Sequence, residues 1–379
     1  KVEQEFDDLT GEMKRLSVRA MHFRSVFMST TAFAASIALA IVLWRGGVIT
    51  RDGVILIGTL SVFMNYAQGM MEPVQWLVQV MSSLVNVQVN VERVTRLLET
   101  ESDVSDTPEV TAKYGDAFHP KKENWEPLYG DIEFQDVTFR YPDGSENVLE
   151  HFNLKVPQGT NVAIVGETGA GKSTLVNLVC RFFEPTQGRI LIDGRDARER
   201  SQLWLHSNIG YVLQTPHLFS GTVLENLRYG RPDATMDEIE AAVKTVSADQ
   251  IIARLPDGYN TDIGEGGNTL STGEKQLLSF ARALLADPRI FVLDEATSSV
   301  DTVTERLIQD AIEKVMAGRT SFIIAHRLST IRRADVILVV HDGKIIESGT
   351  HRSLMNAKGA YYQLYTHQYR EEQTRSMMD

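Results

Sequence analysis

Cysteine is almost absent from this sequence, and its scarcity excludes disulfide-stabilised proteins. The 379 residues include a single cysteine, Cys180, so no internal disulfide framework can form and a reducing compartment is favoured. Cys180 lies in the apolar run TLVNLVCRFF. We interpret it as a packing residue, with a reactive role as the less favoured alternative.

An excess of basic charge and a signal peptide are lacking too. The formal net charge is −12, which argues against nucleic acid as a partner, because nucleic-acid binders usually carry a strongly basic face. The first residue is lysine rather than methionine, and no signal-peptide pattern precedes the first apolar run. We therefore expect the chain to start inside a longer protein, and its length allows about two or three domains.

Two apolar stretches predict helices that span a lipid bilayer. The first, residues 25–44, carries no charge and has about the 20 residues that a span needs. The second, about residues 54–72, contains Asn65 and Gln68, which could line a substrate route or simply form hydrogen bonds between helices. A pair of buried helices in a soluble domain is the alternative to two spans.

The distribution of basic residues predicts the orientation of these spans. The stretch before the first span is richer in Lys and Arg than the loop RGGVITRDG between the spans, with Lys14, Arg15, Arg19 and Arg24 against Arg45 and Arg51. The positive-inside rule then places the chain start in the cytoplasm and the loop outside.

Composition predicts four segments along the chain. Residues 1–99 form a membrane segment with the two predicted spans, and residues 100–130, which are polar with scattered Pro and Gly, form a linker. Residues 131–367 alternate β-branched strands with helical patterns, as α/β domains do. Residues 368–379 form a polar, frayed tail.

The segment NVAIVGETGAGKSTLVNLVC predicts a phosphate-binding loop between a strand, residues 162–165, and a helix. Its G-x-x-x-x-G-K-S pattern provides glycines that let the backbone wrap a phosphate, while Lys172 reaches the β- and γ-phosphates and Ser173 binds Mg²⁺. The helix dipole adds to this anion site. The expected nucleotide contacts are Gly166, Glu167, Thr168, Gly169, Ala170, Gly171, Lys172, Ser173 and Thr174.

The segment RIFVLDEATSSVD supplies carboxylates for the same chemistry. Asp294 ends a predicted buried strand, residues 290–293, and could hold Mg²⁺ through water. Glu295 could polarise the attacking water as a general base. The alternative, in which both carboxylates cap the following helix, is less favoured because the phosphate-binding lysine lies upstream.

With these motifs the sequence resembles the ABC transporter family, of the bacterial multidrug and lipid exporter type, over nearly the whole chain. Further similarities are FRYPDGSENVLEHF, IGYVLQTPHLFSGTVLENL, DIGEGGNTLSTGEKQ, SSVD and IIAHRLSTI. The resemblance implies that Tyr141 stacks on adenine and that Gln214 contacts Mg²⁺ and senses the membrane domain. It also implies that Asp301 crosses a dimer interface and that His326 contacts the γ-phosphate.

The same resemblance implies a fold and the parts that this chain lacks. We expect a pair of transmembrane helices that ends an exporter membrane domain, followed by an α/β P-loop nucleotide-binding domain with an antiparallel β subdomain and a helical subdomain. The first four membrane helices of a half-transporter are not in this sequence, so these helices and a second half-transporter are expected partners.

The segment LSTGEKQ departs from the family's signature motif. The resemblance implies that Ser271 and Gly273 grip the γ-phosphate bound to the partner subunit. Thr272 stands in place of Gly, and Glu274 in place of Gln brings a negative charge toward a phosphate. Both changes should weaken that site. Asymmetric heterodimeric exporters commonly combine an intact catalytic Glu with an altered signature, so we favour a heterodimer over a homodimer.

The resulting prediction is a subunit of an ATP-hydrolysing exporter in the cell membrane, with ATP and Mg²⁺ as cofactors and the nucleotide domain in the cytoplasm. Its substrate would be amphipathic, such as a drug, lipid or peptide. An importer with the exporter fold stays open as an alternative. A soluble ATPase that acts on nucleic acid and a non-hydrolysing regulatory subunit are disfavoured by the apolar spans and by Glu295 and His326, respectively.

Overall fold

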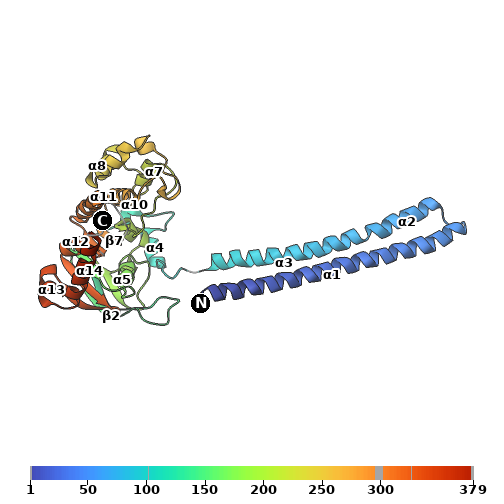
Figure 1. Cartoon of the computed structure of the whole chain (residues 1–379), viewed down its shortest axis with the longest axis horizontal. Helices are drawn as coiled ribbons and strands as arrows, with labels where there is room; N and C mark the ends of the chain where they lie inside the picture. The colour runs from blue at the N-terminus through green and yellow to red at the C-terminus, as the bar shows by residue number, and fades with distance from the viewer. Residues whose placement is uncertain (1, 101, 295–301, 326, 377–379) are drawn as a thin grey trace. The chain divides into compact units, whose positions relative to one another are not determined.

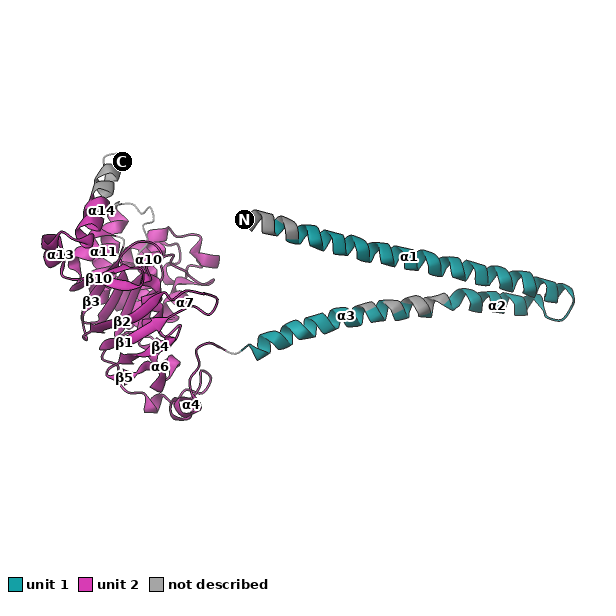
Figure 2. Ribbon diagram, turned by 90° about the horizontal axis from the view of Figure 1, so that it is seen from below, with its two compact units in different colours: residues 1–101 teal, residues 102–379 magenta. Residues whose placement is uncertain are grey.

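The computed structural model describes residues 2–100, 102–294, 302–325 and 327–376. The chain divides into two compact units, residues 1–101 and residues 102–379 (Figure 2). The described part of the first unit is helical and consists of α1 (Val2–Arg51), α2 (Ile57–Gly69) and α3 (Met71–Glu99). Within this unit, α1 and α2 lie side by side (Figure 1).

Helix α1 contains the first predicted span. From Leu9 to Arg51 it is long and apolar enough to cross a membrane, the one such helix among the described residues. The predicted loop over residues 45–53 is wrong over most of its length, because α1 continues through Arg51. A Cβ on Gly46 would lie 2.3 Å from Cδ1 of Leu60 in α2, so this glycine permits close helix contact instead of forming a loop.

The second predicted span, residues 54–72, is divided between α2 and the start of α3. The division lies at Met70, whose backbone angles, φ −64° and ψ −21°, are still those of a right-handed helix. Pro73 explains the interruption, because proline has no N–H to donate to the carbonyl of Gly69. Helix α2 alone, with 13 residues, is shorter than the span of about 20 residues that a bilayer requires.

The second unit is built on two sheets. In its described part, the four-stranded sheet has the order β2-β1-β4-β5 and the six-stranded sheet has the order β10-β9-β3-β8-β7-β6. The strands are β1 (Ile132–Phe139), β2 (Leu149–Val156), β3 (Asn161–Val165), β4 (Gln187–Ile192), β5 (Arg195–Asp196), β6 (Ile209–Val212), β7 (Ile290–Asp294), β8 (Thr320–Ile324), β9 (Val336–His341) and β10 (Lys344–Gly349).

The second unit also contains helices. They are α4 (Pro108–Tyr114), α5 (Lys172–Val179), α6 (Gln202–Ser207), α7 (Val223–Arg228), α8 (Met236–Thr245), α9 (Asp249–Arg254), α10 (Thr272–Leu285), α11 (Thr302–Met316), α12 (Leu328–Arg333), α13 (His351–Ala357) and α14 (Ala360–Ser376). Because α14 continues through Ser376, the predicted frayed tail is helical in its described part.

Two apolar cores hold this unit together. One packs the antiparallel four-stranded sheet and α5 against the larger sheet and includes Phe134, Leu175 and Ile164. The other joins the larger sheet to α10, α11 and the helical region α7–α9 and includes Phe280 and Phe291. These layers confirm the expected P-loop domain with an antiparallel β subdomain and a helical subdomain.

The larger sheet determines where the motifs meet. Strands β9, β3, β8, β7 and β6 run parallel, and β10 alone among the described strands of this sheet pairs antiparallel. The carboxyl ends of parallel strands lie at one edge, which is where α/β proteins bind ligands. The P-loop follows β3, Gln214 follows β6 by two residues, and Asp294 ends β7 at this edge.

Most of the segment predicted as a linker, residues 100–130, packs onto the second unit. Val104, Val110, Tyr114 and Leu128 are buried. Burial alone would raise the pKa of Glu126, but hydrogen bonds from Lys113 and Tyr114 outweigh it and lower the pKa to about 2. The prediction missed this packing because the anchoring side chains are irregularly spaced and follow no helix or strand period.

This packing predicts where the second unit can be separated from the first. We expect a fragment that begins at Ser102 to unfold cooperatively, and one that begins at Asp131 to be less stable by several kcal/mol. The reason is that each fully buried apolar side chain that is lost contributes about 1.5–3 kcal/mol. Urea unfolding followed by circular dichroism measures the difference, with a fragment that begins at Thr100 as the control. Equal stability of the Ser102 and Asp131 fragments would contradict this boundary.

Candidate nucleotide site

The P-loop requires glycine at positions where its backbone touches neighbouring strands. Gly166 has φ +154°, and a Cβ there would lie 2.2 Å from the carbonyl oxygen of Val340 in β9. Gly171 has φ +100°, in the left-handed region, and serves as the N-cap of α5. The spacing of the glycines in the sequence therefore reflects a close backbone contact and a left-handed turn into the helix.

Lys172 lies inside the loop that it terminates. Its Nζ donates hydrogen bonds to the carbonyl oxygens of Gly166 at 2.8 Å and Glu167 at 2.7 Å. Burial lowers the pKa of Lys172, and the charge of Asp294 opposes this shift. The lysine and the carboxylate predicted for the same site are thus close enough to interact electrostatically.

The start of α5 is suited to an anion. Gly171 has no side chain, and no side-chain cap occupies the N–H groups of the first turn, so these groups and the helix dipole can attract a phosphate. The predicted nucleotide contacts differ in solvent exposure. Ala170 and Thr174 are buried, and the exposed ones are Glu167, Thr168, Gly169 and Ser173.

A contact that the sequence analysis missed supports the loop from β9 and β10. The N–H of Gly343, in the turn between these strands, donates to the carbonyl oxygen of Ala170 at 3.0 Å. A Cβ on Gly343 would lie 1.9 Å from the carbonyl oxygen of Val148, so glycine is required here too. The pair Asp342–Gly343 is a hairpin-turn signal, but it does not reveal which segment the turn contacts.

Tyr141 is held beside the first turn of α5. Its hydroxyl group shares a hydrogen bond of 2.9 Å with Oγ1 of Thr174. Its ring packs edge-on against Phe139 and Phe183, with centroid distances of 4.9 and 5.1 Å. Stacking on adenine stays a prediction.

Oxygen-bearing side chains lie at the same edge of the sheet. Asp294 ends β7 and pairs with Ile324 of β8, while Gln214 and Ser173 are exposed to solvent. Carboxylate, amide and hydroxyl oxygens are ligands that Mg²⁺ accepts. Glu295, Asp301 and His326 lie outside the described residues, so their roles stay predictions.

The signature segment forms a hydrogen-bonded cap on α10. Ser271 is the N-cap residue, and its N–H and Oγ both donate to Oε2 of Glu274 at 2.9 Å. In return, the N–H of Glu274 donates to Oγ of Ser271 at 3.3 Å, which completes a capping box. Oε1 of Glu274 accepts a 3.0 Å hydrogen bond from Nη2 of Arg254 in α9. The sequence analysis missed Arg254, because 20 residues separate it from Glu274.

The two helix N-termini therefore differ in their readiness to bind an anion. At α5 no side chain caps the first turn, whereas at α10 the carboxylate of Glu274 already occupies the end of the helix and engages the hydroxyl of Ser271. A carboxylate is stabilised at a helix N-terminus for the same reason as a phosphate. An incoming phosphate at α10 must compete with Glu274.

Known proteins resemble the chain across both units. The ABC transporter family matches residues 149–298. Over 361 residues the chain is 42% identical to the fatty acid ABC transporter ATP-binding/permease protein of Mycobacterium bovis, covering 95% of this chain and 55% of that protein. Over 331 residues it is 42% identical to the ATP-dependent lipid A-core flippase of Desulfotalea psychrophila, covering 87% and 55%.

A solved structure resembles the chain as well. A bacterial Atm1-family ABC exporter with ATP bound has a TM-score of 0.67 and 35% identity, covering 89% of this chain and 56% of that chain. The chain spans about half the length of the curated relatives that it matches.

The P-loop geometry predicts unequal effects of alanine at its glycines. Gly166→Ala must displace the loop from Val340, so we expect the Kd for a fluorescent ATP analogue to rise more than about tenfold, equivalent to 1.4 kcal/mol. Gly169→Ala introduces backbone strain only, since φ is +86° but nothing lies within 4 Å of its Cβ, and its effect should be smaller.

Gly159→Ala is the matched control. It has φ +75° and open space around its Cβ, but it lies between β2 and β3, outside the P-loop. It should lower stability without changing the Kd. If Gly166→Ala bound the analogue as tightly as Gly159→Ala, the role given to the contact with Val340 would be wrong.

Proposed function

Because the chain carries an ATP-binding domain of the ABC transporter family in residues 149–298, we propose that it is the ATP-binding and membrane-spanning part of an exporter. It would couple ATP hydrolysis to export of an amphipathic substrate. The observation that carries this proposal is the P-loop around Lys172, with Asp294 nearby, in one chain with the apolar helix α1.

The residues of the site divide the chemistry among them. The P-loop backbone, Lys172 and the first turn of α5 would hold the phosphates of ATP. Ser173, Gln214 and Asp294 would hold Mg²⁺, which neutralises phosphate charge during phosphoryl transfer. Glu295 would take the proton of the attacking water, and His326 would contact the γ-phosphate.

The substitution Glu295→Gln in the full-length transporter tests this assignment. Removing a general base typically slows a reaction by about 10²–10⁴-fold, so we expect ATP hydrolysis to fall at least about a hundredfold while ATP binding persists. Release of inorganic phosphate measures the rate. Glu240→Gln is the control, since the half-exposed Glu240 of α8 forms an ion pair with Lys244 one turn further along the same helix. Undiminished ATPase activity in Glu295→Gln would refute the general-base role.

We further propose that the transporter is a heterodimer and that this chain donates the weaker signature motif. The support is the carboxylate of Glu274 at the N-terminus of α10, which competes with the phosphate bound to the partner subunit. The partner would then carry an intact signature and lack a catalytic glutamate. The nucleotide bound to the partner subunit would be gripped weakly by the signature motif of this chain. The nucleotide bound to this chain would be gripped more tightly by the intact signature motif of the partner.

Native mass spectrometry of the transporter, extracted gently from its membrane, tests the subunit composition. We expect two different chains. We also expect the partner to lack a glutamate at the position that corresponds to Glu295. Two copies of this chain would mean that LSTGEKQ serves both sites. That result would overturn the heterodimer but leave the assignment as an ATP-driven transporter unaffected.

A further inference from the structure

A buried arginine lies at the end of α5 opposite to the phosphate-binding loop. Arg181 follows the C-cap of α5, and its side chain is only 3% exposed. Its φ is +52°, in the left-handed region, where helices usually place glycine. A buried charge is stabilised only when it is paired and hydrogen-bonded, so the partners of this side chain determine its role.

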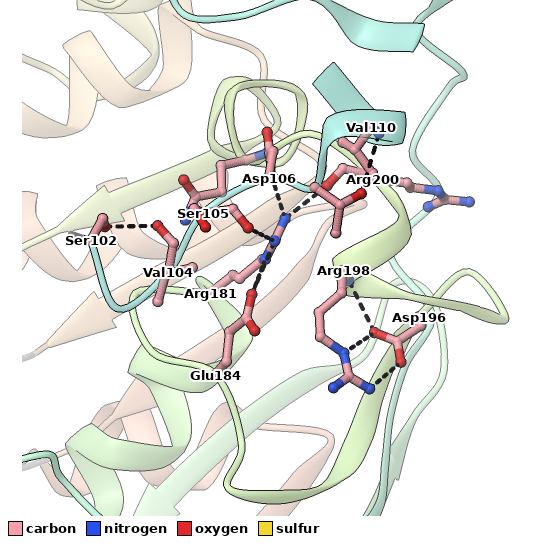
Figure 3. Close-up of polar contacts among 12 residues, drawn as sticks. Ser102, Val104, Ser105, Asp106, Val110, Arg181, Glu184, Asp196, Arg198 and Arg200 are labelled. Carbon is pink, nitrogen blue, oxygen red and sulfur yellow. Dashed lines mark hydrogen bonds and ion pairs between the residues drawn. The ribbon is translucent and has the colours of Figure 1, made fainter. Parts of the chain in front are cut away.

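The guanidinium group of Arg181 uses all of its donors. Nε and Nη2 donate to Oε1 of Glu184 at 3.2 and 3.0 Å. Nη1 donates to Oδ1 of Asp106 at 2.9 Å and to the carbonyl oxygen of Arg200 at 2.8 Å, and Nη2 also reaches the carbonyl oxygen of Ser105 at 3.3 Å. Figure 3 shows Arg181 between these partners. We name Ser105, Asp106, Arg181 and Glu184 the Arg181 clamp.

Asp106 also contacts α6, a second helix whose chain continues to the nucleotide site. Its carboxylate accepts from the N–H of Gln202, the first residue of α6, at 3.0 Å. Helix α6 is followed directly by β6, and Gln214 lies two residues beyond that strand. One carboxylate therefore connects to both routes toward the nucleotide, α5 with Lys172 and α6–β6 with Gln214.

The clamp captures the chain soon after it leaves the first unit. Helix α3 ends at Glu99, and residues 102–106, the leading segment, reach the clamp within seven residues. Helix α5 has eight residues and spans about 12 Å, at 1.5 Å per residue, from the clamp to the phosphate-binding turn. The leading segment is therefore held at one end of a short helix whose other end forms the phosphate-binding turn.

We propose that Asp106 and Arg181 are positioning residues that couple the membrane unit to the nucleotide site through the covalent connection at residues 100–106. This inference rests on the proposed transport function and adds a residue-level route to it. Movement of α3 pulls on Asp106, and Asp106 moves α5 and the start of α6 together. Nucleotide binding at the other end of α5 acts on α3 by the same route, because coupling between two sites is reciprocal.

The test measures nucleotide-driven opening in the full-length transporter. Spin labels are attached through the substitution Asp52→Cys, between α1 and α2, and through a cysteine substitution at the aligned position of the second subunit. In the unmodified protein, ATP with vanadate should lengthen the distance between the labels. In Asp106→Asn we expect this change to be lost or to need about tenfold more ATP, within the usual range of coupling effects.

Two further variants separate coupling from folding. Glu184→Gln alters a different contact of the same guanidinium group, one that lies within the nucleotide unit and away from the leading segment. This variant should open like the unmodified protein. Two glycines inserted between Thr100 and Glu101 leave the clamp intact and slacken the connection, and should impair opening as Asp106→Asn does. All three should still bind a fluorescent ATP analogue, with a Kd within about tenfold of that of the unmodified protein.

Each outcome separates the two proposals. Normal opening in the glycine insertion, or equal impairment in Glu184→Gln, would overturn the coupling role, and the insertion decides the matter if Asp106→Asn fails to fold. Absence of any ATP-driven distance change in the unmodified transporter would instead refute the proposed transport function, on which this inference depends.

Discussion

The contact between the P-loop backbone and strand β9 is the constraint on which the nucleotide site depends. Gly166 lies so close to the carbonyl oxygen of Val340 that no side chain fits between them. This contact fixes the loop against the sheet, so that the chain can turn through Gly171 into α5 and place Lys172 within its own loop. The parallel order of the strands then brings Asp294 to the same edge. Backbone packing therefore forms the cradle, and the polar side chains are added to it.

Capping chemistry gives the two helix N-termini of the nucleotide unit opposite properties. A helix that begins after glycine leaves its first N–H groups to an outside anion, as α5 does. A helix that begins with Ser and carries Glu three residues later caps its own N-terminus: in α10 the N–H of Glu274 donates to Ser271, and the carboxylate of Glu274 accepts from the N–H of Ser271. The cap strengthens α10 as a helix, and its carboxylate competes with an incoming anion, although Arg254 offsets part of the charge of Glu274. Stability and phosphate binding are in conflict at this position.

The sequence could predict what depends on local spacing. The P-loop and the strand that ends at Asp294 follow from short motifs whose geometry is set by neighbouring residues. Gly343, Arg254 and Arg181 were missed because their partners lie far away in the chain. The loop expected at residues 45–53 failed for a related reason, since Gly46 serves contact with Leu60 rather than flexibility. Glycine alone does not reveal whether a turn or a close approach requires it.

The choice of an ion pair at the end of α5 has a physical reason. An apolar contact would hold the leading segment but would allow it to slide, because dispersion and hydrophobic contacts have little directionality. A guanidinium with all its donors engaged fixes the positions of Asp106 and Ser105 relative to α5. Burying such a charge is costly unless it is paired and hydrogen-bonded, so release of the leading segment from Arg181 is unfavourable. The phosphate-binding turn at one end of α5 and the leading segment at the other are therefore joined by directional contacts, as the proposed coupling requires.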